Sequence, residues 1–343
     1  MDKADLKRAV LWDSAADNKV RCKLCAHRCV IADGKPGRCC VRRNIDGVLY
    51  SLNYYKVCSA NPDPIEKKPL FHFQPGTSSF SVATMGCNFR CEFCQNWQIS
   101  QAAIEDGGID GQAISAEQIV TAAVRSGCSS IAYTYTEPTI FMELCADCGR
   151  EGRKHGLSNV FVSNGYMTRE AVEFAAEWLD GINVDLKAFS EDYYKRLCKA
   201  RLEPVLETIK YIAKETNIWL EITTLLVPGE NDSEDELRRL AGFIVSDAGA
   251  DVPWHISRFH PQYKYLDSVA TPTSSLELAE RTGKEAGLHY VYLGNVPGVK
   301  SESTFCYNCG RMLIERFGYR IAANHVKDSC CPDCGARIAG FDL

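Results

Sequence analysis

Short β-rich runs alternate with amphipathic helical stretches between about residue 78 and residue 293. The runs that predict strands are Phe80–Met85, Ser130–Tyr135, Asn159–Ser163, Ile182–Lys187, Trp219–Leu226, Trp254–Phe259 and Tyr290–Leu293. The segments that predict helices are Ala116–Arg125, Arg169–Leu179, Leu202–Lys214 and Glu234–Ser246. Strand followed by helix, repeated, predicts an α/β protein built from parallel βαβ units. Six or seven such units without a Gly-rich dinucleotide loop favour a partial (β/α)6 TIM-like barrel over a Rossmann sheet.

The later strands each separate into an apolar and a polar face, because successive side chains of a strand point to opposite sides. We expect the apolar faces to pack against the helices and the polar faces to point into the barrel. The polar positions are Asn183, Asp185, Lys187, Glu221, Thr223, His255 and Ser257. A closed barrel usually fills its interior with Val, Ile and Leu. A polar, ionisable interior therefore predicts a ligand cavity.

Three cysteines fall within eight residues in the loop Cys87-Asn88-Phe89-Arg90-Cys91-Glu92-Phe93-Cys94. Iron–sulfur clusters are normally closed by four thiolates, so three cysteines leave one iron of a [4Fe–4S] cluster open to another ligand. The loop directly follows the first predicted strand, which places it at the end of the barrel where ligands bind. The alternative is a set of buried or disulfide-paired cysteines.

This loop, with the aromatic Phe93 before its last cysteine, resembles the cluster loop of the radical S-adenosylmethionine (SAM) enzymes. The resemblance implies a barrel of the radical SAM type, in which Cys87, Cys91 and Cys94 hold a [4Fe–4S] cluster and Phe93 lies beside the cofactor. In that superfamily the open iron chelates the amino and carboxylate groups of SAM. An electron from the cluster cleaves SAM into methionine and a 5′-deoxyadenosyl radical.

Three later strand ends also resemble SAM-binding elements of this superfamily. Glu137 occupies the position of the glutamate in the Gly-Gly-Glu element that holds the methionine ammonium, although Tyr135 and Thr136 replace both glycines. The segment around Asn164 resembles the one that meets the ribose and carboxylate of SAM. The residues that we expect to bind SAM are Glu137, Asn164, Asp185 and Lys187, and those that we expect to bind SAM or substrate are Glu221 and His255.

Two C-x2-C-G knuckles follow near the C-terminus, Cys306-Tyr307-Asn308-Cys309-Gly310 and Cys331-Pro332-Asp333-Cys334-Gly335. Paired knuckles at this separation are typical of a four-cysteine zinc ribbon. Iron is the main alternative, because both metals accept tetrahedral sulfur ligands. A site closed by four thiolates has no open position, so we assign it no catalysis.

A further group of cysteines, Cys22, Cys25, Cys29 and Cys39, lies near the N-terminus. The turn-rich stretch Gly34-Lys35-Pro36-Gly37 brings Cys39 back toward the first two. We predict a second metal site from these four residues. Free structural cysteines and an auxiliary iron–sulfur cluster are the alternatives.

The chain has 343 residues, 45% of them apolar and 24% charged, and a net charge of −5. This balance is ordinary for a globular protein and gives no electrostatic footprint for nucleic acid. The charged N-terminus lacks the apolar core of a signal peptide, and no run approaches the length of a membrane span. We therefore expect a cytoplasmic protein with no membrane partner. In that reducing compartment, 18 cysteines indicate metal binding more than disulfides.

The cysteines cluster in three places and predict a Cys-rich N-terminal module (1–76), a radical SAM core (77–299) and a zinc-ribbon module (300–343). The order of the N-terminal cysteine motif, the cluster loop, Tyr133–Pro138 and the ribbon resembles the radical SAM component of the AmmeMemoRadiSam system, related to pyruvate formate-lyase activating enzymes. The resemblance implies AMMECR-type and Memo-type partners and an electron donor such as flavodoxin or ferredoxin.

Three functions are compatible with these observations. The leading hypothesis is an enzyme that abstracts hydrogen from a small molecule or from a group presented by a partner protein. The second is an activase that installs a glycyl radical on a partner. After Cys94 the next cysteine is Cys128, which excludes activases with a ferredoxin-like insertion after the cluster loop. The third is a non-catalytic metal-binding scaffold.

Overall fold

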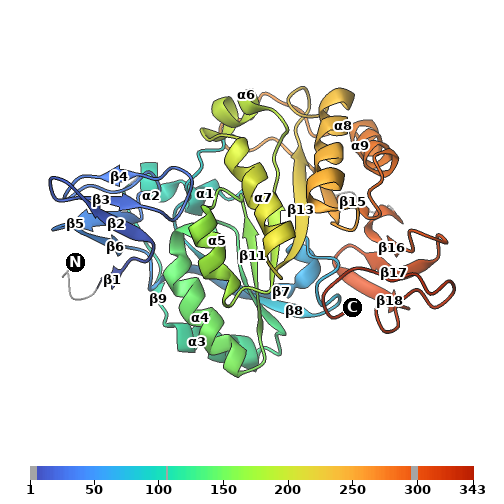
Figure 1. The fold of residues 1–343 in the computed structure, drawn as a ribbon, viewed down its shortest axis with the longest axis horizontal. Helices are drawn as coiled ribbons and strands as arrows, with labels where there is room; N and C mark the ends of the chain where they lie inside the picture. The colour runs from blue at the N-terminus through green and yellow to red at the C-terminus, as the bar shows by residue number, and fades with distance from the viewer. Residues whose placement is uncertain (1–5, 106, 295–299) are drawn as a thin grey trace.

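The computed structural model describes residues 6–105, 107–294 and 300–343. Figure 1 shows three parts in a row: N-terminal strands at one end, a central sheet with its helices, and a small C-terminal sheet at the other end. Residues 1–5 of the charged N-terminal stretch lie outside the described residues. So do residues 295–299, at the predicted boundary between core and ribbon.

The central sheet has nine strands in the order β15-β14-β13-β12-β11-β10-β8-β7-β9. The first seven of that order run parallel to one another. They are β8 (Ser78–Thr84), β10 (Ser130–Tyr133), β11 (Ser158–Ser163), β12 (Gly181–Asp185), β13 (Trp219–Leu226), β14 (Trp254–Arg258) and β15 (Val291–Gly294). Because β15 and β9 end the sheet without pairing to each other, the barrel is open. The predicted partial α/β barrel is confirmed.

Helices follow the strands and cover one side of the sheet (Figure 1). The long ones are α3 (Ala116–Arg125), α4 (Met142–Lys154), α5 (Arg169–Ala176), α7 (Glu203–Glu215), α8 (Glu234–Phe243) and α9 (Thr273–Glu285). The short ones are α1 (Trp97–Ser100), α2 (Ala102–Glu105) and α6 (Glu191–Tyr193). Three of the long helices begin at side-chain caps, Ser115, Thr168 and Ser233, each accepting a backbone N–H of the first turn. Helix α8 ends earlier than predicted, because the chain continues from Ile244 as a π-helical turn.

Strand β7 (Lys56–Pro64) pairs antiparallel with β8, and the short β9 (Gln112–Ala113) pairs with β7. The central sheet therefore begins upstream of residue 77, where the sequence pattern placed the start of the core. The strand is hard to recognise in the sequence because it contains Pro62 and Pro64, which lack the N–H of a sheet ladder. They are tolerated since β9 pairs only with Lys56 and Val57, at the other end of β7.

The N-terminal module consists of two small antiparallel sheets. One contains β2 (Trp12–Ala15), β3 (Lys19–Cys22) and β4 (Val30–Ile31), and the other β1 (Lys7–Arg8), β6 (Val48–Ser51) and β5 (Arg42–Ile45). Their buried side chains belong to the same hydrophobic core as the helices of the barrel. Backbone contacts support this, because Ala26 N–H donates to the Tyr166 carbonyl at 3.1 Å. The module is thus packed onto the barrel.

The C-terminal module is a three-stranded sheet of β16 (Thr304–Phe305), β17 (Met312–Phe317) and β18 (Arg320–Asn324). Arg316 of β17 is 4% exposed and ties this sheet to the barrel. Its guanidinium donates to the Phe71 carbonyl and to Thr304 Oγ1, both at 2.7 Å, and lies over the Phe71 ring. This contact joins residues 245 positions apart in the chain.

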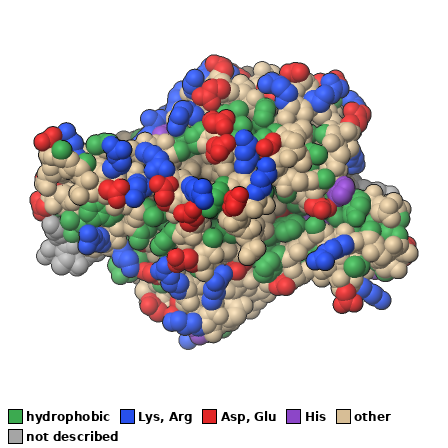
Figure 2. Space-filling model, in the orientation of Figure 1, with side chains coloured by type: hydrophobic (Ala, Val, Ile, Leu, Met, Phe, Trp, Pro, Cys, Tyr) green, Lys and Arg blue, Asp and Glu red, His purple; other side chains and the backbone are tan. Residues whose placement is uncertain are grey.

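Basic and acidic side chains are interspersed over the face of the molecule seen in Figure 2. Ion pairs also join helices to neighbouring loops; Arg153 of α4, for example, pairs with Asp180 in the loop before β12 at 3.0 Å. Among the described residues, no helix is both long and apolar enough to cross a membrane.

Acidification is expected to loosen the junction between barrel and C-terminal module. His72 is fully buried there; its Nδ1 lies 2.7 Å from the Ala339 carbonyl oxygen and its Nε2 lies 2.6 Å from the Tyr292 hydroxyl. Burial lowers the pKa of His72 to about 4 from the usual 6.5. Between these values the unfolded chain binds a proton that the folded chain does not, so stability falls as pH falls. Thermal unfolding between pH 7 and pH 4.5 measures this loss.

The His72→Gln variant serves as the control for that measurement, because glutamine stays polar but does not titrate. We expect its unfolding temperature to decline less steeply between pH 7 and pH 4.5 than that of the native protein. Identical slopes would assign the pH dependence to other groups.

Candidate active site

A cavity of about 320 Å3 opens at the carboxyl ends of the parallel strands. Every residue that the motifs assign to the cluster or to SAM lines it, apart from Glu221 and His255. The lining residues from that set are Cys87, Cys91, Phe93, Cys94, Glu137, Asn164, Asp185 and Lys187. They come from the loops after β8, β10 and β11 and from the end of β12. The fold thus brings together side chains that are up to 100 positions apart in the sequence.

The three thiols lie on a loop whose backbone N–H groups are hydrogen-bonded to a neighbouring segment. Arg90 N–H donates to the Cys198 carbonyl at 3.0 Å, and Glu92 N–H donates to the Leu197 carbonyl at 3.1 Å. Arg90 also donates from its guanidinium to the Cys87 carbonyl at 2.9 Å. These bonds leave the cysteine side chains free to face the cavity. Burial raises the pKa of the Cys87 thiol, with a further contribution from the charge of Glu137.

The Glu137 carboxylate, 1% exposed, begins the 3-10 turn Pro138–Phe141 at the end of β10. Its Oε1 accepts from Thr139 N–H at 3.0 Å and from Ser163 Oγ at 2.8 Å. Its Oε2 accepts one N–H, that of Asn164, at 2.8 Å. Burial raises the pKa of Glu137, and these hydrogen bonds oppose the rise. Oε2 keeps a lone pair for a donor in the cavity.

The backbone before Glu137 shows how one of the two missing glycines is replaced. Tyr135 has a φ of +64°, a left-handed conformation that usually favours glycine. Contacts hold the residue in place: Asn96 Nδ2 donates to its carbonyl at 2.8 Å, and its hydroxyl donates to Asp63. Lys68 lies 4.6 Å from the centre of the Tyr135 ring. The chain therefore keeps the conformation with a side chain in place of the glycine.

Asn164 lies beside Cys87, and Lys187 lies near Cys91. Asn164 Nδ2 donates to Asn88 Oδ1 at 2.7 Å, which fixes the amide beside Cys87. Lys187 Nζ pairs with Asp185 at 2.8 Å and is 13% exposed. Burial opposes the ammonium charge, but the attraction of Asp185 and Cys91 prevails and raises the pKa of Lys187. The cavity therefore offers one cationic group close to the cysteines.

Glu221 and His255, which we expected to bind SAM or substrate, do not line this cavity. Glu221 Oε2 accepts from His255 Nε2 at 2.6 Å, and the two carboxylate oxygens also accept the backbone N–H groups of Phe71 and His72. Glu221 precedes Thr223, which does line the cavity, by two residues on the same face of β13. Two residues along a strand span about 6.6 Å. Glu221 therefore lies deeper in the barrel than the cavity-lining Thr223, at the level where Phe71 and His72, from the segment after β7, fill the interior.

Several cavity residues were not assigned from the sequence, among them Lys67, Gln95, Asn96 and Tyr135. Lys67 and the buried Lys68 both pair with Asp63 of β7, at 2.7 and 2.9 Å. Burial lowers the pKa of Lys68 to about 8. Lys67 follows a segment without strand periodicity or family motif, so only the pairing of β7 with β8 places it at the site.

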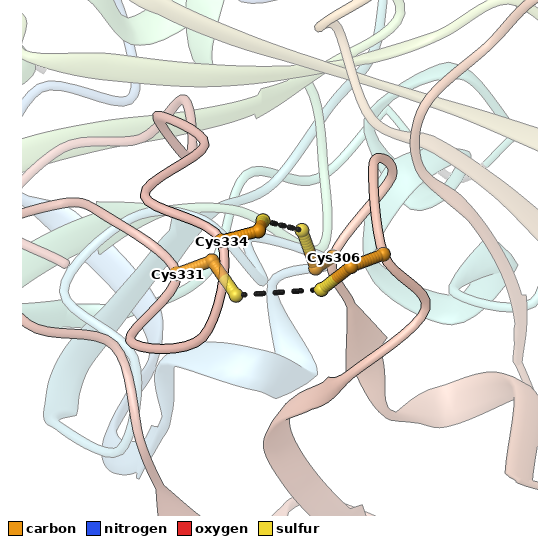
Figure 3. Close-up of side chains that lie close together, drawn as sticks. Cys306, Cys331 and Cys334 are labelled. Atoms are coloured by element: carbon orange, nitrogen blue, oxygen red, sulfur yellow. Dashed lines mark hydrogen bonds between the residues drawn. The ribbon is translucent and has the colours of Figure 1, made fainter.

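The C-terminal knuckles bring four thiols together (Figure 3). The sulfur atoms of Cys306, Cys309, Cys331 and Cys334 all lie within 4.8 Å of one another. The Cys306–Cys334 and Cys309–Cys331 sulfur distances are 3.6 and 3.7 Å. Zinc–sulfur bonds of about 2.3 Å in a tetrahedron imply sulfur separations of about 3.8 Å. The four thiols therefore fit one tetrahedral metal ion.

In the part of the chain that the structure describes, the thiols at the other two predicted sites are spread more widely than this group. A wider set is expected at Cys87, Cys91 and Cys94, since each cysteine of a multi-iron cluster binds a different iron. At the N-terminus, Cys22, Cys25, Cys29 and Cys39 line one small cavity.

The sequence comparisons agree with this geometry. The family model of the radical SAM superfamily matches residues 81–241. An uncharacterized protein of Methanocaldococcus jannaschii is 46% identical over 335 residues, 97% of this chain and 99% of the relative. A second protein of that organism, named as a candidate glycyl-radical enzyme activating enzyme, is 25% identical over 53% of this chain and 68% of its own length. A choline trimethylamine-lyase activating enzyme of Oleidesulfovibrio alaskensis is 29% identical over 32% of this chain and 33% of its own length.

Residues 81–241 of the chain form a radical SAM domain. Such a domain implies an enzyme with a [4Fe–4S] cluster and SAM, whose cleavage at the cluster is general to the family. Within the superfamily, this chain has homologues among the activating enzymes.

Proposed function

We propose that this protein reductively cleaves SAM and uses the product radical to take a hydrogen atom from a substrate bound in the 320 Å3 cavity. The single observation that carries the proposal is the gathering of three cysteine thiols, Glu137 and Lys187 around that cavity. When bound, the cluster supplies one electron from an external reductant such as flavodoxin or ferredoxin. The C5′–S bond of SAM breaks, methionine leaves, and the abstracted hydrogen atom completes 5′-deoxyadenosine.

We assign each of these residues to a part of the cluster or of SAM by its charge and chemistry. Cys87, Cys91 and Cys94 would hold three irons of the cluster. The free lone pair of Glu137 would accept from the methionine ammonium, and Lys187 would face the carboxylate, since charge-assisted hydrogen bonds are the stronger kind. Asn164 would orient the ribose or carboxylate through the side-chain amide that Asn88 holds in place.

The test is conversion of SAM to 5′-deoxyadenosine and methionine by anaerobically reconstituted protein with a strong reductant. We expect slow conversion without substrate and faster conversion with it, because substrate binding can order the site. Reduced, cluster-replete protein that neither binds SAM nor forms 5′-deoxyadenosine would favour the non-catalytic scaffold instead.

A second candidate function is activation of a glycyl radical enzyme, and the two activating-enzyme relatives favour it. In this case the hydrogen donor is a glycine of a partner protein. Incubation with candidate partners and reductant should produce the doublet of a glycyl radical in the EPR spectrum. The absence of that doublet, together with 5′-deoxyadenosine formation stimulated by a small molecule, would favour the first candidate.

The resemblance to the AmmeMemoRadiSam component suggests partner proteins of the AMMECR and Memo types, in the cytoplasm. Anaerobic co-purification of the tagged protein with its partners, followed by comparison of metabolites in cells with and without the gene, would identify the substrate. Failure to retain either partner type would oppose this part of the proposal.

We also propose that the C-terminal thiols hold zinc. Replacing Cys309 or Cys334 by serine should remove about one zinc per chain, because a structural site needs all four ligands. The region from about residue 300 onward should then become sensitive to protease, since metal binding contributes folding energy. Cys330→Ser is the matched control: it removes a neighbouring thiol outside the group and should keep the zinc. Unchanged metal in all three variants would make the knuckles purely structural.

A further inference from the structure

The N-terminal cysteines line one small cavity, apart from the two sites already described. Cys22 ends β3, Cys25 begins a tight turn in which Arg28 N–H donates to its carbonyl at 2.9 Å, and Cys29 returns to pair with the backbone of Cys22 at 2.9 Å. Cys39 arrives from the loop before β5 (Arg42–Ile45). All four line one cavity of about 20 Å3, whose other walls include Ile31, Arg42 and Ile140.

Arg42 is a buried arginine that lines this cavity and has two nitrogen atoms without an acceptor. Arg42 is 1% exposed, and its Nη2 already bonds to the Val10 carbonyl and to Glu143. Its Nε and Nη1 are buried and have no hydrogen-bond partner. A buried cationic donor without an acceptor is costly, and neutral thiols are weak acceptors. Glu143 already pairs with the guanidinium charge, and thiolates bound to a metal would supply the missing acceptors.

We infer that Cys22, Cys25, Cys29 and Cys39 hold a metal centre through four thiolates, with Arg42 as its buried counter-charge. Zinc and an iron–sulfur cluster share this ligand chemistry. Metal binding replaces the protons of the thiols, so the centre is neutralised in part by the metal and in part by the guanidinium. Four thiolates complete a tetrahedral set and leave no open position on a single ion, which indicates a structural role.

The site lies directly behind the cysteine loop of the active site. Its wall residue Ile140 belongs to the 3-10 turn that Glu137 begins. Val41, two residues after Cys39, packs closely against Gly86, the residue before Cys87: a Cβ added to Gly86 would lie 2.7 Å from the Val41 side chain. His27 Nε2 also lies 2.9 Å from the Asn88 carbonyl oxygen. The metal centre therefore fixes the loops on which Cys87 rests.

Metal analysis of matched cysteine variants tests the inference, with all proteins purified anaerobically. Cys22→Ser and Cys39→Ser should each lose about one zinc or about four irons relative to the native protein. The control Cys40→Ser removes the adjacent half-buried thiol, which is not part of the set, and should lose nothing. Loss of zinc identifies a single ion and loss of iron a cluster; equal metal content in native and variant proteins would overturn the inference.

A second measurement tests the inference even if the Cys22→Ser and Cys39→Ser variants do not fold. In the triple variant with alanine at Cys87, Cys91 and Cys94, the N-terminal and C-terminal sets remain intact. X-ray absorption and metal counting should then find two centres with sulfur ligands. Metal for the C-terminal set alone would overturn the inference. Since this variant has no central cluster, the result is independent of whether the protein cleaves SAM.

Discussion

Alanine at Cys87, Cys91 or Cys94 is expected to remove about four irons from the protein and to abolish 5′-deoxyadenosine formation. Each thiol would hold a separate corner of the cluster, and two thiolates do not retain it. Cys91 is 7% exposed and lies in the wall of the cavity, so water is a poor replacement ligand there. Iron content, the visible spectrum and the assay for 5′-deoxyadenosine measure the effect.

Cys198→Ala is a demanding control for this result. The Cys198 thiol is fully buried and lies near Cys91, so the variant disturbs the same region without removing a predicted ligand. We expect it to keep its iron. Full iron retention in all three ligand variants would refute the assignment of the cluster. Iron loss in the Cys198 variant alone would indicate that Cys198, and not these three cysteines, binds the iron.

Glu137→Ala is expected to weaken SAM binding by about 1.5–3 kcal/mol, the range for a hydrogen bond to a charged group, or roughly 10- to 150-fold in Kd. The spectrum of the cluster should change little. The structure adds a second effect, because the carboxylate also accepts from Thr139, Ser163 and Asn164. Removing it leaves these buried donors unpaired, so the thermal stability should fall as well.

Two further variants separate these effects. Ser163→Ala removes one local hydrogen bond but keeps the carboxylate, and should change SAM affinity far less than Glu137→Ala. Lys187→Ala should weaken SAM binding without disturbing the turn at Pro138–Phe141. SAM titration by calorimetry on cluster-loaded protein gives the affinities. If neither Glu137→Ala nor Lys187→Ala lowers the affinity, the charged groups of this cavity do not bind SAM.

The open barrel and the cysteine groups were predictable because their signals are local. Alternation with a period of two locates strands such as β13, whose predicted and observed bounds are both Trp219–Leu226. The C-x2-C-G knuckles specify four close thiols because each knuckle closes the same turn, with Gly310 and Gly335 donating to the carbonyls of Cys306 and Cys331, each at 2.9 Å. In both cases, neighbouring residues determine the geometry.

Tertiary structure decided which inward-facing polar residues reach the cavity. Strand alternation places Glu221, Thr223 and His255 on one side of the sheet, but Glu221 binds His72 N–H, 149 positions away. The sequence by itself determined the strands, the cysteine loop and the knuckles, since these depend on short-range spacing. The depth of each polar side chain, the pairing of β7 with β8 and the meeting of Arg42 with four cysteines depend on long-range packing, which no local pattern encodes.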